Sequence, residues 1–207
     1  MINTLLKFVL NFFELNYFSH KNFILKILGA KISNNVIFLK GVHFNLSRAQ
    51  NLNILENVKI GRNTLIKIRE NGIININNNC TVEEDCRIIS ARDGTLTLKN
   101  NCYIGSSSFI LSGGQLEIGT NVMVSSFCYI SSSKRQLKRK IDLVDQEYDH
   151  EKIIIENDVL IGRSSTIMPN SIIKKGSVIG ANSYVKIKTE EYGIYAGSPL
   201  KLIRFRD

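Results

Sequence analysis

The sequence is poor in residues that support several kinds of chemistry. Tryptophan is absent, proline occurs twice and histidine three times among 207 residues. The four cysteines form no Cys-x-x-Cys pair, so a cysteine-based zinc site is not expected. The histidines, His20, His43 and His150, are too scattered to suggest a three-histidine metal centre. We therefore expect no bound metal.

Long hydrophobic runs are also lacking. Residues 1–18 are largely apolar, but Lys7 and Glu14 interrupt them, so they do not predict a membrane span. They also lack the basic start and small-residue cleavage site of a signal peptide. We expect residues 1–30 to form a helical cap on the main domain, with reversible membrane-surface contact as the alternative. The expected location is the cytoplasm.

Acidic residues are fewer than basic ones, 18 against 27, which gives a formal net charge of +9. This excess favours anionic partners such as phosphate groups or an acidic membrane surface. No DNA- or RNA-binding motif accompanies it, so nucleic acid is not an expected partner. The hydrophobic content of 43% is too high for a disordered chain.

An apolar residue returns every six positions over most of the chain. Six matches neither the helical period of 3.6 nor the strand period of two. The repeat runs in triplets, whose first members are Ile32, Ile54, Ile76, Leu98, Ile118, Ile155 and Ile173. Three six-residue units per turn describe a triangular coil of short strands. The predicted fold is all-β, a parallel β-helix of about seven coils, interrupted by a long loop at residues 131–152.

One corner of each coil has its own pattern. Asparagine or aspartate precedes a small or β-branched residue there, at Asn35, Asn57, Asn79, Asn101, Asn121 and Asp158. These residue types tolerate left-handed backbone angles and suit tight corners. The four cysteines occupy equivalent small-residue slots, two positions before an aliphatic residue, and are expected to be structural. Reduced thiols agree with a cytoplasmic location.

The repeats "LIGRSS" and "VIGANS" and the ending "GANSYVKIKTEEYGIYAGSPLKLIR" resemble the hexapeptide-repeat acyltransferases, most of all those that O-acetylate bacterial surface polysaccharides. The resemblance implies a left-handed β-helix over residues 31–191, a C-terminal tail over 192–207 and a homotrimer. It also implies acetyl-CoA as acyl donor and a sugar or glycan as acceptor, with active sites between neighbouring subunits. The cofactor-binding residues that it implies are Gly162, Arg163, Gly180, Ala181, Lys186, Lys201 and Arg204.

The residue that activates the acceptor is harder to assign. Related enzymes usually carry a histidine where this chain has Ser131 to Lys134, and often a tryptophan where it has Leu160. Histidine suits the base that takes a hydroxyl proton. His150 is the candidate, because it lies in the 131–152 loop between Asp149 and Glu151, which are expected to raise its pKa. Alternatively, His150 is a plain residue of a solvated, self-paired loop.

Three functions remain open from the sequence. The leading one is acetyl-CoA-dependent O-acetylation of a sugar hydroxyl in a bacterial surface polysaccharide or its precursor. The others are N-acetylation of a nucleotide-linked amino sugar, and a catalytically degenerate β-helix that only binds its partner.

Overall fold

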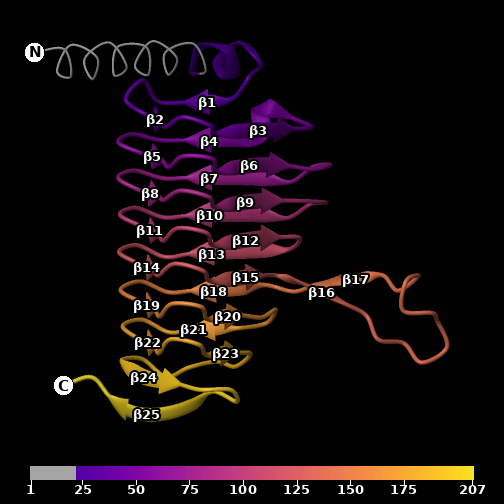
Figure 1. The fold of residues 1–207 in the computed structure, drawn as a ribbon, viewed down its shortest axis with the longest axis vertical. Helices are drawn as coiled ribbons and strands as arrows, with labels where there is room; N and C mark the ends of the chain where they lie inside the picture. Colours follow the sequence, from indigo (N-terminus) through magenta and orange to yellow (C-terminus); the bar gives the residue numbers. More distant parts are fainter. Residues whose placement is uncertain (1–21) are drawn as a thin grey trace, which may run out of the picture.

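Short strands stack into a three-sided prism in which each coil adds one strand to each face (Figure 1). The computed structural model describes residues 22–207, and the likenesses reported below confirm the left-handed parallel β-helix. Sheet A contains β1 (Lys31–Ile32), β4 (Leu52–Ile54), β7 (Ile73–Ile76), β10 (Thr95–Leu98), β13 (Gln115–Ile118), β18 (Ile153–Ile155) and β21 (Ile172–Ile173).

The second face, sheet B, extends to the C-terminal end of the chain. It contains β2 (Ile37–Phe38), β5 (Lys59–Ile60), β8 (Thr81–Val82), β11 (Tyr103–Ile104), β14 (Met123–Val124), β19 (Leu160–Ile161), β22 (Val178–Ile179), β24 (Gly193–Ala196) and β25 (Lys201–Phe205). Residues 192–207, expected to form a tail, therefore mostly continue this sheet. β25 runs antiparallel to β24, so the exposed edge of the last parallel strand is paired.

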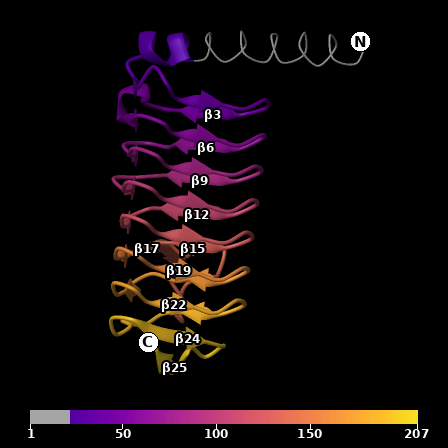
Figure 2. The same ribbon diagram turned by 90° about the vertical axis from the view of Figure 1, so that its left-hand side faces the viewer.

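The third face, sheet C, forms a column of stacked strands, several of which are labelled in Figure 2. It contains β3 (His43–Leu46), β6 (Leu65–Ile68), β9 (Arg87–Ser90), β12 (Phe109–Ser112), β15 (Tyr129–Ser131), β20 (Thr166–Ile167) and β23 (Tyr184–Val185). A single 3-10 turn, η1 (Ala49–Asn51), precedes β4. We name the corners by the sheets they connect: the A–B, B–C and C–A corners.

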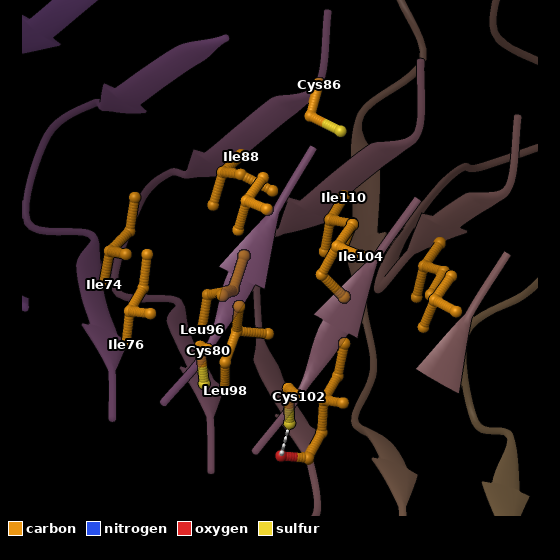
Figure 3. Close-up of a cluster of buried hydrophobic side chains, with 14 of the residues drawn as sticks. Ile74, Ile76, Cys80, Cys86, Ile88, Leu96, Leu98, Cys102, Ile104 and Ile110 are labelled. Carbon is orange, nitrogen blue, oxygen red and sulfur yellow. Dashed lines mark hydrogen bonds between the residues drawn. The ribbon is translucent and has the colours of Figure 1, made fainter. Parts of the chain in front are cut away.

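The sixfold repeat is confirmed as the source of the core. Members of successive triplets pair in register, for example Ile32 with Ile54 and Ile104 with Val124. Their side chains stack inside the prism (Figure 3), and all but the half-buried Phe44 are buried. Burying such aliphatic side chains is the main favourable term in folding.

Asparagine side chains build a ladder along the A–B corner. Each amide from Asn35 to Asn101 donates to the carboxamide oxygen of the next coil's asparagine, and the ladder ends at Asn121. The predicted left-handed backbone is found at this corner from the second to the sixth coil, but not at Asn35. In the sixth coil, Asp158 instead accepts a hydrogen bond from Arg206 at 3.0 Å.

The four cysteines are buried and unpaired, as expected for structural thiols. Cys80 and Cys102 each donate to a backbone carbonyl of the following coil, at 2.9 Å in both cases. Burial raises the pKa of Cys86 to about 11 and also raises that of Cys128. Cys86 and Cys128 are therefore packed hydrophobes rather than nucleophiles.

The predicted N-terminal cap is described only in part. Residues 22–27 form a helical turn, whereas His20 and most of the segment predicted to touch a membrane lie outside the described residues. Among residues 22–207, no helix is long and apolar enough to cross a membrane.

Candidate active site

The 131–152 loop leaves the prism at the C–A corner as a hairpin (Figure 1). Its stem consists of β16 (Ser133–Arg135) and β17 (Tyr148–His150), which pair antiparallel with Ser133 opposite His150. The hydroxyl of Ser133 lies 2.9 Å from Nδ1 of His150. Nε2 of His150 is buried and has no hydrogen-bond partner among the described residues. An unpartnered ring nitrogen is available to accept a proton.

Gly113, between β12 and β13, lets the hairpin approach the prism. A Cβ at Gly113 would lie 2.3 Å from both His150 Nδ1 and Ser133 Oγ. The backbone N–H groups of Gly113 and Gly114 donate to the buried hydroxyl of Ser132, at 2.9 and 3.1 Å. Gly113 therefore makes room for the imidazole, and Ser132 fixes the backbone of both glycines.

The outer part of the hairpin is ordered by internal hydrogen bonds. Gln146 is buried and its amide nitrogen donates to the carbonyls of Lys138 and Ile141. The guanidinium of Arg135 donates to the carbonyl of Gln146 at 2.9 Å and stacks over the ring of Tyr148 at 4.6 Å. These contacts give the loop a defined shape, as expected of an excursion that positions functional residues.

The acidic neighbours of His150 do not orient it. Glu151 pairs with Lys134 at 2.5 Å, and Asp149 accepts a hydrogen bond from Gln136 at 2.7 Å. Asp149 does raise the pKa of His150, but the expected net rise is wrong. Burial and the positive charge of Arg92 lower that pKa, and the opposing field of Asp149 is the smaller effect. The neutral imidazole, which is the form that acts as a base, is thereby favoured.

A pocket of about 290 Å³ opens beside this histidine. Inserted turns of successive coils line one side of it, and the hairpin lines the other. The lining residues are Arg69, Glu70, Ala91, Arg92, Leu111, Gly113, Ser133, Tyr148 and His150. The predicted base thus lies in a concave site with converging polar groups, the usual form of a small-molecule site.

The predicted donor-binding residues lie elsewhere. Gly162 and Arg163 follow β19, and Gly180 and Ala181 follow β22, so all four are at the B–C corner of the last coils. Ala181 and Arg163 are exposed, and the Arg163 guanidinium lies 4.8 Å from the centre of the Phe127 ring.

The remaining predicted donor residues lie after the last B–C corner. Lys186 directly follows β23, while Lys201 and Arg204 belong to β25. All three are exposed, and Arg204 lies 3.5 Å from the carboxylate of Asp207. Exposed cations are compatible with a phosphorylated ligand.

Packing alone accounts for Gly162. A Cβ there would lie 2.5 Å from the backbone nitrogen of Ala181 in the next coil. The same crowding occurs at Gly61 and Gly105, which occupy this slot in earlier coils. The glycine therefore reflects the close spacing of coils and does not by itself indicate a cofactor.

The sequence pointed to His150 but not to Gly113, Arg92 and Tyr148, which line the same pocket. One signal was available: the coils that start 20 or 22 residues apart carry extra residues at one corner. Those extra residues form the turns that line the pocket. A metal site is not indicated either, because residues 22–207 contain no cluster of three potential ligands.

Comparisons with known proteins agree with this architecture. A family model described as "Bacterial transferase hexapeptide (six repeats)" matches residues 152–186. The dTDP-4-amino-4,6-dideoxy-D-glucose acyltransferase of Escherichia coli is 30% identical over 157 residues, which cover 73% of this chain and 80% of that protein. The chain therefore belongs to the hexapeptide-repeat transferase family, and within it to the acyltransferases.

Other relatives match less completely. WbbJ of Escherichia coli K12, whose name assigns it to lipopolysaccharide biosynthesis as an O-acetyl transferase, is 26% identical over 66% of this chain and 74% of its own. An acetyltransferase of Lysinibacillus sphaericus, named for macrolides, is 51% identical over 53 residues, 26% of this chain, and the chain spans only 29% of it.

Solved structures share the fold. The polysialic acid O-acetyltransferase OatWY superimposes with a TM-score of 0.68 at 19% identity, over 85% of this chain and 84% of that one. AntD, an N-acyltransferase from Bacillus cereus solved with dTDP and 3-hydroxybutyryl-CoA, gives 0.57 at 21% identity, over 90% and 88%. At such identities the likeness extends to the fold alone.

Proposed function

We propose that the protein transfers an acetyl group from acetyl-CoA to a hydroxyl of a sugar in a bacterial surface polysaccharide or its precursor. The observation that carries this proposal is His150, which lines a pocket of about 290 Å³ and whose buried Nε2 has no hydrogen-bond partner among the described residues. The relationship to WbbJ supports O-acetylation.

In the proposed reaction, Ser133 positions His150, and His150 acts as the base toward the acceptor hydroxyl. Nδ1–H of His150 donates to Ser133 Oγ in the tautomer that leaves Nε2 basic, so Ser133 is a positioning residue. Nε2 takes the proton of the sugar hydroxyl while its oxygen attacks the thioester carbonyl. The C–O bond forms, the C–S bond breaks, and the imidazolium returns the proton to the departing sulfur. Acyl-CoA, when bound, supplies the activated acyl group.

The donor is proposed to lie at the B–C corner of the last coils. The exposed Arg163 and Ala181 and the cationic strand β25 fit a phosphorylated, extended ligand. Lys186, Lys201 and Arg204 would meet its phosphate groups, and the Ala181 backbone would face its chain.

The direct test combines the protein with acetyl-CoA and acceptor glycans, and measures CoA release and the stability of the product to mild alkali. We expect an alkali-labile ester on the acceptor. An alkali-stable product would instead identify N-acetylation of an amino sugar, the alternative favoured by the dTDP-amino-sugar relative. No CoA release and no rise in Tm with excess acetyl-CoA would indicate a protein that binds without catalysis.

Assembly of a complete site from two chains is the second part of the proposal. Within one chain, His150 belongs to the C–A corner, whereas Ala181 belongs to the B–C corner. Two different corners of one prism cannot face the same reaction, but corners of neighbouring prisms can. A homotrimer would pair the hairpin of each subunit with the donor corner of the next.

Mixed assemblies of two inactive variants test this arrangement. His150→Ala lacks the base, and Ala181→Trp fills the donor corner, so each alone is expected to be inactive. In every trimer that contains both variants, one interface of three would pair an intact hairpin with an intact donor corner, restoring roughly a third of the activity. Co-expression with two affinity tags and assay of doubly purified protein measures this. Mixed assemblies as inactive as their parents would place both residues in one chain's site.

A further inference from the structure

The acidic side chains in and around the His150 pocket already have hydrogen-bond or ion-pair partners. Glu70 is already engaged: one carboxylate oxygen accepts the backbone N–H of Arg92 at 2.8 Å, and the other lies 3.5 Å from the Arg69 guanidinium. Asp93 accepts a hydrogen bond from Asn71 at 2.9 Å. Asp149 and Glu151 are bound to Gln136 and Lys134 respectively.

Arg92 is the exception in this pocket. Its guanidinium has no hydrogen bond or ion pair with any residue in 22–207, although it lines the pocket and its charge acts on His150. Its backbone is held at a φ of 55°, a conformation that is uncommon for a bulky side chain. Glu70 stabilises that conformation through the N–H of Arg92. Glu70 has the same conformation in the preceding coil, at a φ of 49°, so this turn is a regular feature of the fold. What distinguishes Arg92 is the unpaired cation that it brings to the pocket.

An unpaired guanidinium is best matched by an oxyanion. Its planar donors bind a carboxylate or phosphate through two parallel hydrogen bonds, which neutral hydroxyls do not reproduce. At roughly 30 Å³ per water, the pocket has space for about ten waters, which corresponds to a single sugar unit. The anion and the reacting hydroxyl would therefore belong to the same or an adjoining sugar.

We propose that the acceptor is an acidic sugar, whose carboxylate or phosphate is held by Arg92 while its hydroxyl is presented to His150. This inference rests on the proposed function, because it assigns the substrate class of the same site. Arg92 would act as a specificity-determining residue and Glu70 as the residue that positions it.

The test measures binding independently of acetyl transfer. Glucuronate, its methyl ester and glucose 6-phosphate are titrated into the protein at millimolar concentrations, and the imidazole NMR signals of His150 are followed. We expect saturable shifts with one or both anions and at least tenfold weaker binding of the neutral ester, since a charge-assisted pair contributes about 1.5–3 kcal/mol. The uronate and phosphate arms distinguish the two anion sources.

Variants assign the effect to one residue. Arg92→Gln should abolish the preference for the anion, whereas Arg62→Gln, an exposed arginine that does not line the pocket, should retain it. Equal binding of glucuronate and its ester, or no response to any of the three sugars, would overturn the inference. So would an Arg92→Gln variant that keeps the anion preference. Acetyl transfer to neutral glycans would leave the proposed function intact in each case.

Discussion

Replacing His150 with alanine is expected to lower kcat/KM for acetyl transfer by about 10²- to 10⁴-fold, the usual contribution of a general base. Of the histidines, His150 alone lines the pocket, and its Nε2 has no hydrogen-bond partner among residues 22–207. His43, on β3, is exposed and distant in the stack, so His43→Ala is the matched control and should retain full activity. CoA release measures both variants, and equal rates for the wild type and His150→Ala would eliminate His150 as the base.

The pH profile gives the same prediction a second readout. A base works in its neutral form, and burial together with Arg92 lowers the pKa of His150 below its ordinary value of 6.5. The imidazole therefore stays neutral until the pH falls through that lowered pKa, where kcat/KM should decline. The acid limb of the wild-type profile is expected below pH 6.5 and should be missing from the residual activity of His150→Ala. An acid limb above pH 6.5 would contradict the assignment.

The core of the fold could be predicted because its physical cause is periodic. Every coil must bury the same three inward positions, so register follows from spacing alone, as the pairing of Ile60 with Val82 illustrates. The A–B corner was predictable for a similar reason, since asparagine is both tolerant of left-handed angles and able to bond to its neighbour. Two residues of the first coil depart from these patterns: Phe44 is only half-buried, and Asn35 lacks the left-handed backbone. No described coil precedes this one.

The second left-handed corner was not predictable from residue type. Asn63, Asp85, Ser107 and Phe127 all adopt positive φ values at the B–C corner. A phenylalanine in such a position gives no local signal, because its conformation is imposed by the coils stacked on either side. Tertiary context here overrides the preference of the residue.

The candidate site was predictable at one residue only. His150 could be found by asking which histidine lies near an interruption of the repeat. Its surroundings could not, because the hairpin brings residues from five separate segments together and directs Asp149 and Glu151 toward other partners. The predicted rise in pKa failed for this reason: sequence adjacency does not measure burial or the distance to Arg92.

Gly113→Ala is expected to reduce kcat/KM by about 100-fold, although the change adds only a methyl group far from the donor corner. The new Cβ would lie 2.3 Å from both Nδ1 of His150 and Oγ of Ser133, closer than nonbonded atoms approach. The imidazole must therefore move. Because β16 and β17 are paired in the stem, the backbone cannot shift easily, and the ring is expected to turn away from Ser133. Misplacement of a catalytic group by about 1 Å can cost this much.

Gly114→Ala is a matched control for this substitution, because it adds the same methyl group to the adjacent residue. Its Cβ would lie 3.4 Å from the nearest atom, the carbonyl oxygen of Glu151, which is an ordinary contact. Neither glycine has a positive φ, so neither alanine is strained by its own backbone. Activity and Tm measured for both variants separate displacement of the imidazole from general destabilisation. If Gly113→Ala retains the activity of Gly114→Ala, the contact between Ser133 and His150 does not position the base.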